Sequence, residues 1–184
     1  MNYDPVMSKQ MNLHLHNLAN DERASEINEH LFTIKEIAIK VKAKTIVELG
    51  TGSGFSLLAL IAGTIENKGE VLTVDLNPCQ NAQQMVKKYG ENICRFVQGD
   101  DMRVVQSWTR EIDLLLIDTS HKYDHTLAEL RQWGKFVKSV IILHDIVADK
   151  GTWDAIYDYL KEHPYGFRYE CHFWNNGLGI LWRQ

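Results

Sequence analysis

The sequence predicts a single-domain α/β fold, with a mostly parallel seven-stranded sheet, helices on both faces and an antiparallel C-terminal hairpin. Three observations support this expectation. Short apolar segments alternate with longer segments of helical periodicity, as in strands joined by crossover helices. The runs at 114–117 and 140–143 contain only leucine, isoleucine and valine, which is typical of parallel strands covered on both faces. Asn175-Asn176-Gly177 separates two apolar segments and predicts a hairpin turn.

The elements can be placed in order along the 184 residues. Residues 1–20 are polar, and we expect an irregular arm or lid in front of a domain that spans 21–184. Apolar residues recur on one face of an expected helix over 22–42. The expected strands are 45–49, 71–75, 93–97, 113–117, 139–144, 167–173 and 178–183. The expected helices between them are 54–65, 79–89, 101–109 and 122–134.

Two helix starts carry capping signals. Asn77, followed by Pro78, should cap the helix after the second strand. Thr152 should cap a last helix that ends before Pro164. The residues expected on the inner face of that helix are Trp153, Ile156, Tyr157 and Leu160.

The turn after the first strand points most directly to a function. Gly50, Gly52 and Gly54 lie between a buried strand and a helix. Residues without a Cβ allow a sharp turn and the close approach of a ligand, and the free N–H groups of the helix suit an anion. A dinucleotide fingerprint would need a third glycine at position 55, which is Phe55. The turn therefore predicts a small anionic metabolite, and the alternative is a tight turn without a ligand.

Two acidic residues narrow the choice of ligand. Glu48, at the end of the first strand, can accept a hydrogen bond from an ammonium group, which a dinucleotide lacks. Asp75 ends the second strand, where an acid commonly binds ribose hydroxyls; the alternative is an acid that caps a helix or faces solvent. A carboxylate, an ammonium and a ribose together indicate a nucleoside built on an amino acid.

The segments VELGTGSGFS, VLTVDLNP and FVQGDD together resemble class I S-adenosylmethionine-dependent methyltransferases, over about residues 44–183. The resemblance implies a Rossmann-like fold and S-adenosylmethionine as the cofactor. In that family the glycine loop holds the methionine end of the cofactor. The acid after the second strand binds the ribose, and the Gly-Asp pair after the third strand lies beside the adenine. The implied cofactor-binding residues are Glu48, Gly50, Thr51, Gly52, Ser53, Asp75, Gly99, Asp100, Asp101 and Asp118.

The C-terminal half is similar to a bacterial subgroup of that family with a D-x-x-H-x-Y element and an L-H-D strand end. Here these are Asp118, His121 and Tyr123, followed by 143–145. Adjacent parallel strands would bring Asp118, His144 and Asp145 into one pocket.

A hydroxyl acceptor must lose a proton, and the sequence allows two mechanisms for removing it. His144 or His121 could act as a general base, with Asp118 also in the catalytic group. Alternatively, Asp118 and Asp145 could hold Mg²⁺, which lowers the pKa of the hydroxyl. Related catechol-type enzymes carry Asp-Asn where this chain has Asp145-Ile146, so one ligand of that pattern is missing.

Composition limits the partners. The formal net charge of −4 disfavours a nucleic-acid substrate, and no apolar run approaches the length of a membrane span. Three scattered cysteines without a C-x-x-C pair are typical of a reduced, cytoplasmic protein. We therefore expect methyl transfer to a small-molecule hydroxyl, with a homodimer as one way to complete the acceptor site. The alternatives are an aminopropyl transferase on the same scaffold, or a non-catalytic cofactor-binding partner protein.

Overall fold

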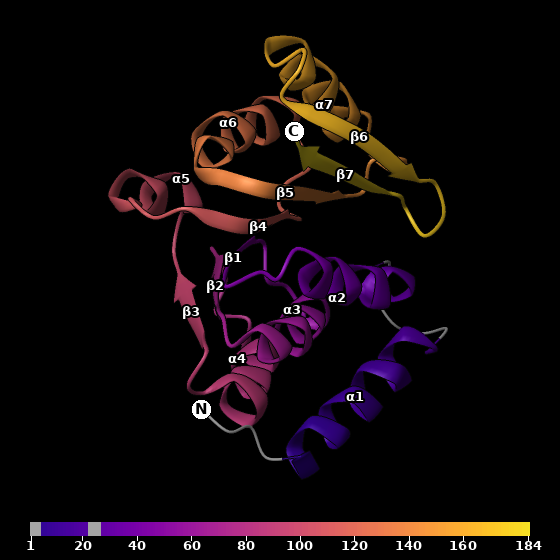
Figure 1. Ribbon diagram of the computed structural model, residues 1–184. Coiled ribbons are helices and arrows are strands. Elements are labelled where there is room, and N and C mark those ends of the chain that lie inside the picture. The colour runs from indigo at the N-terminus through magenta and orange to yellow at the C-terminus, as the bar shows by residue number, and fades with distance from the viewer. Residues whose placement is uncertain (1–4, 22–26) are drawn as a thin grey trace.

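The computed structural model describes residues 5–21 and 27–184. Within the described residues, its seven-stranded sheet has the order β3-β2-β1-β4-β5-β7-β6, and β7 alone runs opposite to the other strands (Figure 1). The strands are β1 (Thr45–Leu49), β2 (Glu70–Asp75), β3 (Cys94–Gln98), β4 (Ile112–Ile117), β5 (Val137–His144), β6 (Phe167–His172) and β7 (Leu178–Arg183). The predicted fold class is confirmed, because every expected strand is present within about two residues of its predicted bounds.

Helices cover both faces of this sheet. The α-helices are α1 (Pro5–Ala19), α2 (Leu31–Lys40), α3 (Phe55–Asn67), α4 (Gln80–Met85), α5 (Asp101–Val104), α6 (Tyr123–Trp133) and α7 (Lys150–Glu162). Short 3₁₀ turns are formed by Asn28–His30, Val105–Ser107 and Gly134–Phe136, and a π turn by Val86–Gly90. Figure 1 shows α1 to α4 on one side of the sheet and α6 and α7 on the other.

Alternation along the central strands builds one core on each face. Leu114 and Leu116 of β4 pack into the core beneath α2 and α3, whereas Leu115 and Ile117 pack into the core beneath α6 and α7. Successive side chains of a strand point to opposite faces, so a continuous apolar run supplies both cores. The arrangement places the carboxyl ends of the parallel strands at one edge, where open α/β sheets bind ligands.

The C-terminal hairpin also confirms its prediction. Asn175, Asn176 and Gly177 all have positive φ, at 47°, 63° and 88°. Asparagine and glycine tolerate this left-handed region better than other residues, which explains why the turn forms here. The hairpin places β7 beside β5, with Leu178 opposite His144.

The N-terminal segment differs from the expected irregular arm, because Pro5–Ala19 forms a helix. Met11 and Leu15, four residues apart and therefore on one helical face, are buried in the core that α3 also lines. Of the helix expected over 22–42, residues 22–26 lie outside the described part, and α2 occupies Leu31–Lys40. A lid role for the N-terminal segment stays a prediction.

Both expected caps are wrong. The helix after β2 begins at Gln80 with Cys79 at its N-cap, and Asn77 instead donates its backbone N–H to Asp75. The last helix begins at Lys150, where Asp149 caps it by accepting a hydrogen bond from the backbone N–H of Gly151.

The inner face of α7 also differs from the expectation. Ile156 is buried as predicted, but Trp153 and Tyr157 are 36% and 58% exposed. The other residues that α7 buries are Thr152, Ala155 and Tyr159. The buried positions thus recur at spacings of three and four residues, which is the periodicity of one helical face. Trp153 and Tyr157 lie beside that face, and their size allows partial exposure.

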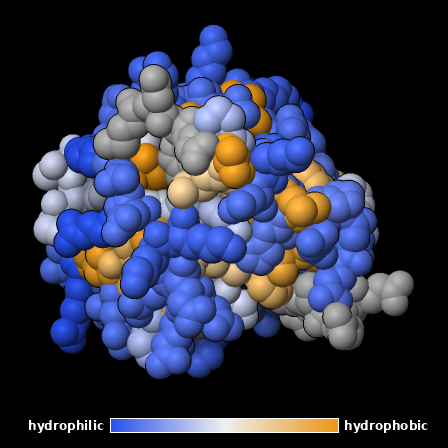
Figure 2. Space-filling view, turned by 90° about the horizontal axis from the view of Figure 1, so that it is seen from below, coloured by the Kyte–Doolittle hydropathy of each residue, from blue (hydrophilic) through white to orange (hydrophobic). Residues whose placement is uncertain are grey.

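The surface is mostly polar where it can be seen. On the face shown in Figure 2, hydrophilic residues predominate and apolar residues form small, separate groups. Within 5–21 and 27–184, no helix is both long and apolar enough to cross a membrane.

Candidate active site

The glycine loop is held tightly against the end of β4. Gly50 has a φ of +84°, and a Cβ at this position would lie 1.8 Å from the backbone oxygen of Asp118. Gly54 also has a positive φ, and a Cβ there would lie 2.9 Å from Ala82. Gly52, with a φ of +49°, has nothing within 4 Å of its Cβ position. Two glycines therefore permit close packing of the backbone, while the third faces open space.

That open space belongs to a cavity of about 300 Å³ at the carboxyl ends of the parallel strands. Of the predicted cofactor residues, six line it: Gly50, Gly52, Asp75, Gly99, Asp101 and Asp118. The other four, Glu48, Thr51, Ser53 and Asp100, are not among its lining residues. Six residues that the sequence did not mark as cofactor-binding complete the lining: Val74, Leu76, Asn77, Thr119, Ser120 and His125.

Asp75 is fixed by backbone donors. Its Oδ2 accepts hydrogen bonds from the N–H groups of Thr51 at 2.9 Å and Gly52 at 3.0 Å, and its Oδ1 from that of Asn77 at 2.8 Å. Burial opposes ionisation, but these hydrogen bonds outweigh it and lower the pKa of Asp75. The wall of the cavity thus carries an ionised carboxylate that also orders the glycine loop.

Glu48 lies in a different environment from the one its predicted role requires. Its side chain is fully buried, and its Oε2 accepts a 2.5 Å hydrogen bond from the Thr73 hydroxyl. Burial raises the pKa of Glu48 to about 8, and the charges of Asp118 and Asp75 act in the same direction. The raised pKa favours the neutral form of this carboxyl group, which lies behind the cavity wall, and its contact with a cofactor ammonium stays a prediction.

Asp100 has a local structural role. Its side chain accepts a hydrogen bond from the backbone N–H of Met102 at 2.9 Å and so caps α5. The neighbouring Asp101 points into the cavity instead. Tyr123 of the D-x-x-H-x-Y element likewise ties α6 to α7, because its hydroxyl donates to Asp158 at 2.8 Å.

Two carboxylates and two imidazoles meet beside the cavity, as the strand order predicts. Nε2 of His121 lies 3.2 Å from Asp118 Oδ1 and 3.1 Å from Asp145 Oδ2. Nδ1 of His144 lies 3.5 Å from Asp118 Oδ1 and 3.2 Å from Asp145 Oδ2. Burial alone would raise the pKa of Asp118, but hydrogen bonds from the two histidines lower it to about 2.

The surroundings of His144 do not fit the predicted general base. Nδ1 faces two carboxylates, and Nε2 lies 3.3 Å from the carbonyl oxygen of Asn175. All of these partners are acceptors, so both ring nitrogens carry protons and neither has a free lone pair. Burial opposes this state, but Asp118 and Asp145 outweigh it and raise the pKa of His144 to about 10. His144 is therefore placed to donate to the two carboxylates, and its role as a general base stays a prediction.

Asp118, His121 and Asp145 have the composition of a metal site. One potential ligand atom of each lies within 4.8 Å of the others. Among the residues that the structure describes, none donates a hydrogen bond to the buried Oδ1 of Asp145, and a cation would satisfy it. His121 and Asp145 both have positive φ, at 56° and 58°, a strained conformation that proteins often keep at functional sites. The donor set fits a divalent cation even though the Asp-Asn pair of the catechol-type pattern is missing.

Known proteins with similar sequence and structure agree with this geometry. A family model described as a methyltransferase domain matches residues 47–146. The O-methyltransferase hkm8 of Aspergillus hancockii is 29% identical over 92 residues, which cover 48% of this chain and 36% of that protein. The chain thus spans about a third of the length of this curated relative.

Solved structures share the fold along the whole chain. An O-methyltransferase from Bacillus cereus, in complex with SAH, superposes with a TM-score of 0.72 at 14% identity and covers 100% of this chain and 93% of its own. The O-methyltransferase TomG from Streptomyces achromogenes, in complex with SAM, gives a TM-score of 0.70 at 14% identity, with coverage of 100% and 91%. With the family model matching more than half of the chain, the protein belongs to the family of methyltransferase domains.

Proposed function

We propose that this protein transfers the methyl group of S-adenosylmethionine to a hydroxyl group of a small molecule. The observation that carries the proposal is one cavity lined by the glycine loop, Asp75 and Asp118, with paired carboxylates and imidazoles beside it. The cavity fits a nucleoside that carries an amino acid. The carboxylates and imidazoles beside it fit the removal of a proton. The names of the relatives, which include O-methyltransferases, support oxygen as the acceptor atom.

The cofactor would lie along the carboxyl ends of the first strands. Backbone around Gly50 and Gly52 would receive its methionine end, and Asp75 its ribose. A carboxylate has about four acceptor positions, so Asp75 can bind ribose hydroxyls while it keeps its backbone donors. Gly99 and Asp101 line the part of the cavity that would take the adenine.

The chemistry needs orientation and one proton transfer. When bound, the cofactor would supply the methyl group: an O–CH₃ bond would form, the S–CH₃ bond would break, and its electron pair would stay on sulfur. The sulfonium is already a charged leaving group, so the protein mainly aligns the reactants and excludes water. The hydroxyl proton must still leave, and His144 does not fit this task because both of its nitrogens face acceptors.

We therefore assign the activation of the acceptor to a divalent cation such as Mg²⁺, held by Asp118 and Asp145 with His121 as a third ligand. Such an ion would supply Lewis acidity that lowers the pKa of a bound hydroxyl. His144 would act as a positioning residue, because it donates to both carboxylates. We also place the enzyme in the reducing cytoplasm, since Cys79, Cys94 and Cys171 are all free thiols.

A panel of hydroxylated metabolites, incubated with methyl-labelled cofactor, would test the activity. Chelation should abolish transfer, and added Mg²⁺ should restore it. The Asp145→Asn variant should lose turnover while it retains cofactor binding by calorimetry. A protein that binds no S-adenosylmethionine or S-adenosylhomocysteine would contradict the proposed function as a whole. Turnover that survives chelation would contradict only the metal role.

A further inference from the structure

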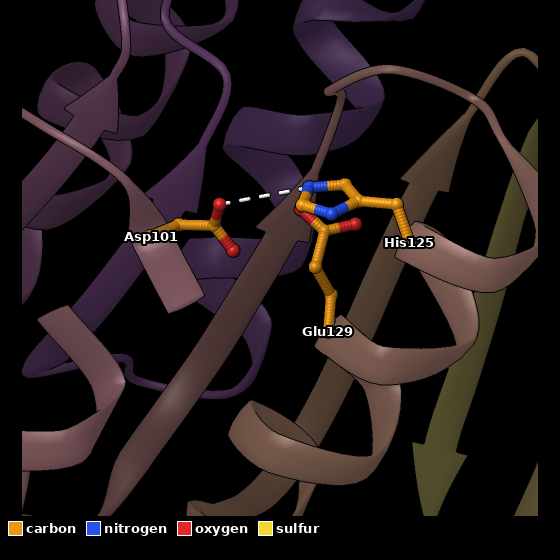
Figure 3. A group of neighbouring side chains, drawn as sticks. All are labelled: Asp101, His125 and Glu129. Carbon is orange, nitrogen blue, oxygen red and sulfur yellow. Dashed lines mark ion pairs between the residues drawn. The ribbon is translucent and has the colours of Figure 1, made fainter. Parts of the chain in front are cut away.

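A second group of metal-ligating side chains lies on the wall of the same cavity (Figure 3). Asp101 is the first residue of α5, and His125 and Glu129 are four residues apart on one face of α6. Nε2 of His125 lies 3.3 Å from Glu129 Oε1 and 3.6 Å from Asp101 Oδ1. Figure 3 shows both carboxylates turned toward the imidazole. This group shares no residue with the Asp118 cluster.

The two carboxylates are buried and short of positive charge. The side chain of Asp101 is 9% exposed and that of Glu129 is 0% exposed. Glu129 accepts from the Thr119 hydroxyl at 2.9 and 3.0 Å, but Oδ2 of Asp101 is buried without a hydrogen-bond partner. Burial and the charge of Glu129 raise the pKa of Asp101 to about 6. His125 faces one oxygen of each carboxylate, but among the described residues Oδ2 of Asp101 has no partner, and a cation additional to His125 would satisfy it.

We propose that Asp101, His125 and Glu129 bind a first-row divalent transition-metal ion such as Zn²⁺ or Mn²⁺. One imidazole and two carboxylates are a donor set that such ions accept. Ligand atoms about 2.1 Å from a tetrahedral ion lie about 3.4 Å apart. The separations of 3.3 and 3.6 Å from the imidazole are close to this spacing.

The position of the site suggests how it would be completed. Asp101 and His125 line the cavity, so any remaining coordination position of the ion would face the space where water or a ligand can enter. Thr119, through its hydrogen bonds to Glu129, would orient that ligand from outside the coordination shell. The proposal does not depend on the methyl acceptor or on the metal at Asp118 and Asp145.

The test also distinguishes metal binding from two other roles for the same residues. His125 could act as the only cation of the group, in an ion-paired triad without a metal. Alternatively, Asp101 could contact the adenine of a bound cofactor directly. Neither role predicts that a metal ion binds in the absence of cofactor.

The experiment uses metal-free protein carrying Asp145→Asn, which removes one carboxylate of the other cluster. Titration with Co²⁺, followed by visible d–d absorption and by calorimetry, should show one bound equivalent. Adding Asp101→Asn should weaken Co²⁺ binding at least about tenfold. Adding Asp100→Asn, which changes the neighbouring helix-capping carboxylate, should leave the affinity unchanged. Circular dichroism and thermal melting check that each variant is folded.

If the Asp101→Asn protein does not fold, His125→Gln provides the same measurement, because the His125 side chain is 34% exposed and tolerates change more readily. Absence of Co²⁺ binding in the folded Asp145→Asn protein would overturn the proposal. An equal affinity with and without Asp101→Asn would also overturn it. Weaker S-adenosylhomocysteine binding in Asp101→Asn, with Co²⁺ binding unchanged, would assign Asp101 to the adenine instead.

Discussion

Replacing Glu48 with glutamine should remove a pH dependence of stability that this buried carboxyl group imposes on the protein. Glu48 is fully buried at the end of β1, and burial raises its pKa from 4.5 to about 8. Glutamine keeps the shape and the acceptor oxygen for the Thr73 hydroxyl but cannot ionise. The variant therefore isolates the ionisation of this one side chain.

The sign and size follow from the two pKa values. Below pH 4.5 the carboxyl is protonated in both the folded and the unfolded chain, so it adds no pH dependence. Between 4.5 and about 8 only the unfolded chain releases the proton, so stability falls as pH rises. The loss is about 1.4 kcal/mol per pH unit, or on the order of 5 kcal/mol over the whole range. Above about pH 8 both states are ionised and the loss stops growing.

Urea unfolding, followed by tryptophan fluorescence, would measure this at intervals from about pH 5 to about pH 8. The free energy of unfolding of Glu48→Gln, relative to the wild type, should increase steadily with pH. Glu66→Gln, an exposed glutamate on α3, is the matched control and should show no such trend. A difference between Glu48→Gln and the wild type that stays constant over this range would refute the reasoning.

Four further substitutions test other parts of the structure. Gly50→Ala should cost more than about 3 kcal/mol of stability in urea unfolding, because its Cβ would lie 1.8 Å from the Asp118 backbone oxygen. Gly52→Ala has no such neighbour and should cost only about 1–2 kcal/mol, so an equal loss in both variants would contradict the steric argument. Asp149→Ala should lower stability by about 1 kcal/mol in thermal melts, as loss of a helix cap does, and no change would remove its capping role. Asp75→Ala should weaken S-adenosylhomocysteine binding about tenfold or more by calorimetry, and full affinity would exclude its ribose role.

The sheet could be predicted from the sequence because its signals are local and strong. The continuous run Leu114–Ile117 must be buried on both faces, and the glycines after Leu49 must mark a strand-to-helix turn. Asn175, Asn176 and Gly177 all favour the positive φ that this turn requires, so the hairpin could also be predicted from the sequence. The proximity of Asp118 and Asp145 could be predicted from strand order alone, since neighbouring parallel strands end at the same edge of the sheet.

The rest depends on contacts between distant segments, which no local pattern records. The N-terminal helix has a polar composition, and only Met11 and Leu15 reveal that α3 gives it a surface to pack on. The Asp101 group was missed for a similar reason, because only its His125–Glu129 part has a readable spacing of four residues. That spacing is common on solvated helices and does not by itself indicate a site. The site forms only because α5 brings Asp101 close to His125.

The cluster of Asp118, His121, His144 and Asp145 is linked to both halves of the chain, and this follows from the position of β7. Because β7 pairs antiparallel with β5, Leu178 lies opposite His144, and the turn before β7 is held at the edge where the parallel strands end. The carbonyl oxygen of Asn175 in that turn lies 3.3 Å from Nε2 of His144 and 3.2 Å from Nε2 of His30. His30 precedes α2 and is fully buried, so this single carbonyl connects the N-terminal half, the C-terminal hairpin and the paired carboxylates. A displacement of the turn would alter both imidazole contacts together, so the positions of His30 and His144 are coupled through this carbonyl group.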